Sequence, residues 1–97
     1  MSKLVKEDQW VWVIVQDPGK DEKFLGQHDE EKDISFIPAF LEKEDAQRSL
    51  IQLKTDRNSL YEPQAVLYEE LLTHSKEHGF VVFILNERGE ILEKTGP

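Results

Sequence analysis

Two segments of the chain are apolar without a break, and they limit the fold more than any other feature of the sequence. The first lies in QWVWVIVQD, residues 9–17, and the second in FVVFILN, residues 80–86. Successive side chains of a β-strand point to opposite faces, so a strand that is apolar throughout must be covered on both faces. The two segments therefore predict interior strands, placed as neighbours at the centre of one sheet.

The other predicted strands are shorter or carry a proline. Residues 24–28 follow the turn DPGKDEK and pair back as a hairpin, and residues 91–93 follow a turn that contains Gly89. Residues 34–40 (ISFIPAF) form a strand, and Pro38 places it at a sheet edge or a bulge because proline cannot donate a ladder hydrogen bond. Residues 60–65 (LYEPQA) fit either a short strand or a loop.

Two amphipathic helices separate these strands. The first begins among the carboxylates at 42–45, which favour the positive end of a helix dipole, and ends near Lys54. The second runs from about Val66 to His78 and stops at Gly79. Their apolar faces consist of Ala46, Leu50, Ile51 and Leu53 in the first helix and of Leu67, Tyr68, Leu71, Leu72 and Ser75 in the second.

These elements predict an α/β (α+β) domain in the order β-β-β-α-(β)-α-β-β. A single mixed or antiparallel sheet of four to six strands with two helices packed on it is the simplest architecture. The 97 residues suit one domain at 9–93, with a flexible leader at 1–8 and a C-terminal tail at 94–97. We expect a cytoplasmic protein, because the start of the chain has no apolar signal segment.

Composition narrows the classes of function. The net charge of −8 opposes nucleic acid and anionic membranes, and no run of Lys or Arg offsets it. There is no cysteine, which excludes disulfides, zinc–thiolate sites and thiol nucleophiles. The chain has no G-x-S-x-G, no GxGxxG and no Walker motif. The sequence therefore favours a binding domain over an enzyme and predicts no cofactor.

One row of side chains could hold a metal or a small ligand. Glu70, His74 and His78 recur every four residues, which places them on one side of the second helix. Imidazole and carboxylate are metal ligands, but the sequence locates no further strong ligand and no HExxH. A solvated Glu–His flank, with His78 at the negative end of the helix dipole, explains the same pattern, and we favour it over a metal site.

The surplus of aromatic residues on the strands points to a protein partner. Most of these residues are explained by core packing, but two helices need not cover a whole sheet face, and an exposed apolar patch marks a partner site. We expect an interaction module for an unidentified protein, or for a second copy of the chain. Its predicted contact residues are Trp10, Phe36, Pro38 and Phe40.

Three segments, VWVIVQDPGKDEKFLGQH, FIPAFLEKEDAQRSLIQL and LYEELLTHSKEHGF, resemble an uncharacterised family of small domains from cyanobacteria and chloroplasts. The family has a V-x-V-L-x-F-N-x-G opening strand and an F-E-x-E-D-D-A-x-R strand-to-helix junction. The positions matching this family are Phe40, Glu42, Glu44, Asp45, Ala46, Arg48 and Gly79–Phe80. A weaker resemblance is to SseB-like (enhanced serine sensitivity) domains, through Ile37, Pro38, Phe40, Ala46, Ile84, Asn86 and Gly89. These resemblances imply the fold and bring no catalytic residue.

Overall fold

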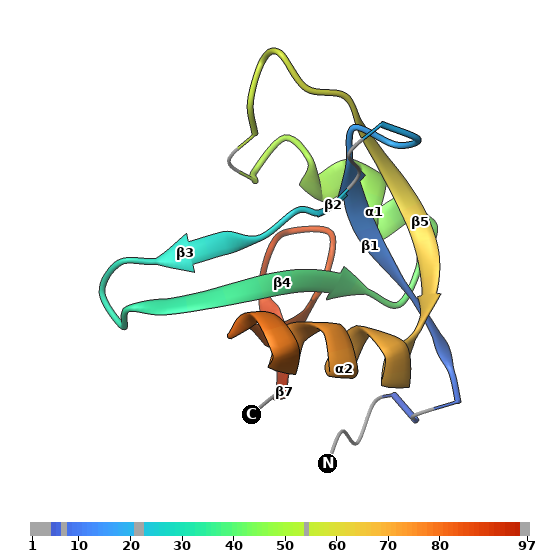
Figure 1. The fold of residues 1–97 in the computed structure, drawn as a ribbon, viewed down its shortest axis with the longest axis vertical. Coiled ribbons are helices and arrows are strands. Elements are labelled where there is room, and N and C mark those ends of the chain that lie inside the picture. The colour runs from blue at the N-terminus through green and yellow to red at the C-terminus, as the bar shows by residue number, and fades with distance from the viewer. Residues whose placement is uncertain (1–4, 7, 21–22, 54, 96–97) are drawn as a thin grey trace.

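The computed structural model describes residues 5–6, 8–20, 23–53 and 55–95. Within them, seven strands and two helices build one mixed sheet with its covering layers, which confirms the α+β class (Figure 1). The sheet has more strands than predicted, partly because the expected strand at 24–28 is split in two. The elements are β1 (Trp10–Gln16), β2 (Lys23–Phe24), β3 (Gln27–Asp29), β4 (Ile34–Phe40), α1 (Lys43–Ser49), β5 (Tyr61–Leu67), α2 (Tyr68–His78), β6 (Val81–Leu85) and β7 (Ile91–Thr95).

β1 and β4 pair over only two residues and then diverge, and we call this point of divergence the fork. β5 pairs with β1 along its whole length. On its other side β1 pairs with β4 at Trp12 and Val13, and with β2 at Val15 and Gln16. β3 in turn pairs with the first half of β4, so the β2–β3 segment fills the space where β1 and β4 diverge. β6 and β7 follow beyond β4, and the predicted direct contact between β1 and β6 is therefore wrong.

Pro38 lies in the middle of the sheet, so its predicted place at an edge or a bulge is wrong. β4 pairs in parallel with β6 from Phe36 to Phe40. On the opposite side of β4, the pairing with β3 ends at Phe36 and the pairing with β1 begins at Ala39. Pro38 falls between these two partners, at the fork, where the ladder is interrupted. A central strand can accept a proline there because that side has no neighbour that needs its N–H.

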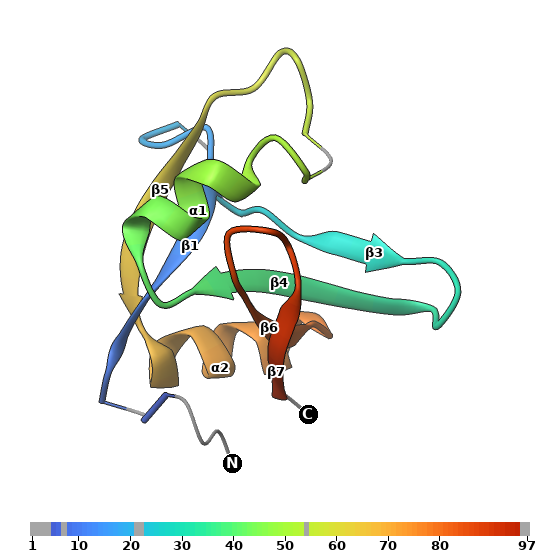
Figure 2. The same cartoon turned by 180° about the vertical axis from the view of Figure 1, so that it is seen from behind.

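The two helices cover opposite faces of the sheet (Figures 1 and 2). Each face has its own core cluster, so the prediction that both apolar strands are covered on both faces is confirmed. The α2 face buries Val11, Val13, Val15, Ile37, Ala39, Val82 and Ile84 against Tyr68 and Leu71. The α1 face buries Ile14, Leu25, Phe40, Phe83 and Leu85 against Ala46.

Both helices are shorter than the sequence predicts. α1 ends at Ser49 and continues as a turn, so Ile51 leaves the predicted core stripe and is 92% exposed; Lys54 lies outside the described residues. α2 begins at Tyr68, because Leu67 is still paired with Trp10 in the β1–β5 ladder. The segment that fitted strand or loop is thus a full strand.

The ends of the described chain take part in the fold. Val5, within the predicted leader at 1–8, is 2% exposed and belongs to the core cluster of the α2 face. Residues 1–4 and 7 lie outside the described residues. β7 extends to Thr95, so residues 94–95 of the predicted tail at 94–97 belong to the sheet, and residues 96–97 are not described. No helix in the described ranges has the length and apolar character needed to cross a membrane.

Gly79 ends α2 in the left-handed conformation, with φ of 76°, as the sequence predicts, and its N–H donates to the Ser75 carbonyl. A Cβ at this position would meet no atom within 4 Å, so a substitution is opposed by the backbone alone. We expect Gly79→Ala to lower the free energy of unfolding by about 1 kcal/mol in urea denaturation. Gly79→Asn should cost less, because asparagine tolerates this conformation. Equal losses for both variants would contradict this account.

Candidate functional site

Four apolar side chains form a surface at one end of the β1–β5 pair, which we call the tryptophan surface: Trp10, Trp12, Ala65 and Leu67. Trp10 pairs directly with Leu67, and Trp12 with Ala65, so all four share the sheet face that α1 covers in part. Trp10 is 58% exposed and Ala65 is also exposed, whereas Trp12 and Leu67 are half-buried. An exposed tryptophan beside apolar neighbours is a typical contact point for another protein.

One basic side chain contacts the tryptophan surface, and two acidic residues lie close along the chain to its members or to that basic residue. Lys43, at the start of α1, lies over the Trp12 ring with its Nζ 5.7 Å from the ring centroid. This ammonium covers one part of the surface by a cation–π contact and leaves Trp10 exposed. Exposed Asp8 lies two residues along the chain from Trp10, and exposed Glu42 directly precedes Lys43.

The structure separates the four predicted contact residues. Phe40 is 0% exposed and Pro38 is also fully buried, so neither can touch a partner, and their predicted role is wrong. β4 has neighbouring strands on both sides, and Phe40 lies in the core cluster between the sheet and α1. Phe36 is half-buried and stacks on Phe83, with ring centroids 4.4 Å apart. It also lies four residues along β4 from the strand position that faces Trp12, so the structure does not join it to Trp10.

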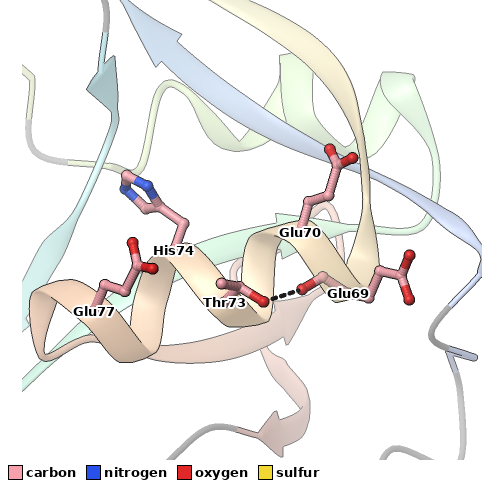
Figure 3. Close-up of a pocket in the computed structure, with 5 residues that line it drawn as sticks. All are labelled: Glu69, Glu70, Thr73, His74 and Glu77. Atoms are coloured by element: carbon pink, nitrogen blue, oxygen red, sulfur yellow. Dashed lines mark hydrogen bonds between the residues drawn. The ribbon is translucent and has the colours of Figure 1, made fainter.

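His74 stands between two hollows on the α2 side of the sheet. An open acidic hollow is lined by Glu69, Glu70, Thr73, His74 and Glu77. Figure 3 shows the side chains of Glu70 and His74 on the same side of α2, one turn apart. The other hollow, a cavity of about 240 Å³, is lined by Val15, Lys23, Phe24, Gln64 and His74. His74, which the four-residue spacing in the sequence singles out, therefore forms part of the wall of both hollows.

The predicted row of Glu70, His74 and His78 forms only in part. The His74 and His78 rings contact each other, with centroids 4.4 Å apart, as their spacing of four residues implies. His74 also meets the Phe24 ring in an edge-to-face contact at 4.7 Å. Among the described residues, no group of three or more His, Asp or Glu side chains is placed to hold a metal ion.

Burial lowers the pKa of His74 below the ordinary histidine value of 6.5; His78 lowers it further and Glu77 opposes the shift. The folded chain therefore binds a proton at His74 more weakly than the unfolded chain does. The stability that is linked to the neutral His74 ring is fully present above pH 6.5 and is lost as the pH falls below that value. We expect the unfolding free energy to fall as pH falls below that value. His74→Gln should make this slope shallower in urea titrations at several pH values. An unchanged slope in the variant would contradict the assignment.

Several residues of these sites carry no sequence signal of their own. Ala65 and Leu67 join the tryptophan surface only through the cross-strand register, and Phe24 and Gln64 meet His74 only when α2 packs on the sheet. The signal that could have located them is the pairing of residues 61–67 with β1, which needs the strand assignment that the sequence left open. No protein-family model, curated protein or solved structure matches the chain, and the family resemblances remain predictions.

Proposed function

We propose that the chain is a small cytoplasmic interaction module, without catalysis, that binds a basic segment of a partner protein on the tryptophan surface. One observation carries the proposal: Trp10 is 58% exposed although the sheet beside it is densely buried on both faces. A tryptophan ring offers a large rigid contact area at low entropic cost, and such rings dominate binding energies at protein interfaces.

The charges favour a basic partner. The net charge is −8, and exposed Asp8 lies two residues along the chain from Trp10. A Lys or Arg side chain of the partner would be attracted to this negative charge and could stack on the Trp10 ring. Pairing of the surface with a second copy would bring together two chains that each carry a net charge of −8, and repulsion between these like charges opposes it.

The test is an affinity capture from a lysate of the native host with three tagged proteins: wild type, Trp10→Ala and Leu60→Ala. Leu60 is a matched control, since it is 76% exposed and precedes β5 at the opposite end of the β1–β5 pair. We expect wild type and Leu60→Ala to recover one partner near stoichiometrically, and Trp10→Ala to recover at least about tenfold less. High salt should weaken the capture of the partner, because salt screens the attraction between the acidic chain and the basic segment.

Three results would contradict the proposal. Equal recovery by Trp10→Ala and wild type would place the partner elsewhere, and a capture without any partner would remove the basic segment as the ligand. Size-exclusion chromatography of the three proteins belongs to the same test. A dimer that dissociates on Trp10→Ala substitution would assign the surface to a second copy instead.

A further inference from the structure

The cavity beside His74 has the properties of a small-molecule site that is independent of the tryptophan surface. It lies on the other face of the sheet, between α2 and the strands β1, β2 and β5. We infer that it binds a small, neutral, flat ring that carries an amide-type hydrogen-bonding edge, as aromatic carboxamides and nucleobases do. The argument rests on its floor, its polar groups, its size and its charge.

The floor of the cavity is apolar and contains an aromatic ring. Val15 and Phe24 are directly paired across β1 and β2, so their side chains share the α2 face. The Phe24 ring meets His74 edge-to-face, with centroids 4.7 Å apart and planes at 67°. Two rings in this arrangement present a corner against which a third flat ring can pack in an offset or edge contact.

Two polar side chains complete the lining. Gln64 on β5 and His74 on α2 are both half-buried, and neither side chain hydrogen-bonds to another of the described residues. A glutamine amide offers a donor and an acceptor, and so does a neutral imidazole. Burial, and then His78, lower the pKa of His74, which favours the neutral ring. A carboxamide or nucleobase edge supplies the matching pair of groups.

Size and charge restrict the ligand further. The volume of about 240 Å³ is smaller than the ~300–1,000 Å³ of sites for drug-sized molecules, so the cavity suits a ring with few substituents. Glu70 and Glu77 line the hollow on the other side of His74 and disfavour an anion. Exposed Lys23 lies at the rim and disfavours a cation. A neutral ligand avoids both penalties.

The test is a titration of the full chain, followed by amide NMR shifts, with benzamide and with adenine as separate probes. We expect saturable shifts of Val15, Phe24, Gln64 and His74 with at least one probe, at a dissociation constant of about 1–10 mM, which suits a fragment-sized ligand. Cyclohexanecarboxamide, which keeps the amide but lacks the flat ring, should bind at least about fivefold more weakly than benzamide. Tighter binding of benzamide would indicate a carboxamide ligand, and tighter binding of adenine would indicate a nucleobase.

Two variants and a control complete the experiment. Phe24→Leu removes the ring, and Gln64→Leu removes the amide; each should weaken the better probe at least about fivefold. Phe36→Leu changes a half-buried phenylalanine on the opposite face and should leave the affinity unchanged. If one of the two cavity variants does not fold, the other still decides. No saturable shift with benzamide or adenine, or equal binding by the variants and wild type, would overturn the inference.

Discussion

Phe40→Ala is expected to lower the free energy of unfolding by about 3–5 kcal/mol, the cost of a large cavity in a rigid core. Phe40 is 0% exposed and lies at the point where β1, β4 and β6 meet, paired with Trp12 on one side and with Leu85 on the other. A domain of this size is stable by only about 5–15 kcal/mol. The variant should therefore unfold at a much lower urea concentration than wild type.

Phe36→Ala is the matched control for this prediction. Phe36 lies on the same strand and the same face but is only half-buried, so its truncation should cost clearly less, about 1–2 kcal/mol. Equal losses for the two variants in urea denaturation would contradict the burial that the structure assigns to Phe40. The comparison also matters for function, because a Phe40 variant that fails to bind a partner would do so through unfolding.

Leu71→Ala is expected to cost about 2–5 kcal/mol, since it opens a cavity in the other core cluster. Leu71 is fully buried and joins α2 to the sheet, where it packs with Val11, Ile37 and Val82. Leu72, the next residue, is half-buried at the side of the same cluster. Leu72→Ala should therefore cost about 1–2 kcal/mol, less than the Leu71 change.

The measurement for this pair is equilibrium unfolding in urea, followed by far-ultraviolet circular dichroism. A larger loss for Leu72→Ala than for Leu71→Ala would mean that α2 is rotated relative to its described position. The two large predictions are independent, because Phe40 and Leu71 lie in different clusters on opposite faces of the sheet. If only one of the two substitutions causes a large loss of unfolding free energy, only the core cluster on that face of the sheet is as tightly packed as the structure implies.

Hydrophobic period was enough to predict most elements of this fold, though not the strand at 61–67, and it did not predict the order of the strands in the sheet. The two continuously apolar strands are covered on both faces, and α2 buries Tyr68, Leu71 and Ser75 as its pattern indicates. A period of two says which face a side chain occupies and nothing about which strand lies beside it. Strand neighbours depend on backbone pairing between residues far apart in sequence, as in the parallel pairing of β4 with β6.

Pro38 shows how one local rule misplaced part of the site. The strand at 34–40 is also apolar on both faces, with Phe40 on one and Ile37 on the other, which is the pattern of an interior strand. The proline rule, in contrast, predicts an edge strand and leaves Phe40 accessible to a partner. The interruption of the ladder at the fork, where β3 gives way to β1, could not be inferred from local sequence.

The candidate sites were predictable only where one residue carried the signal. Trp10 was identified by its aromatic side chain at the start of an apolar strand, and His74 by its spacing from His78. Ala65 and Gln64 reach these sites through the β1–β5 register, in which neighbouring residues of β5 face opposite sides of the sheet. No property of the residues themselves reveals that register.

The most direct test of the proposed function uses a protein in which Trp10 is the single tryptophan. Trp12→Phe produces it, because the chain has two tryptophans. When the captured partner is added, the account predicts that Trp10 emission shifts to the blue and that iodide quenching falls by about half or more, as expected for an exposed ring that becomes buried at an interface. Unchanged emission and unchanged quenching at saturating partner would contradict it, because the Trp10 ring would still face water in the complex.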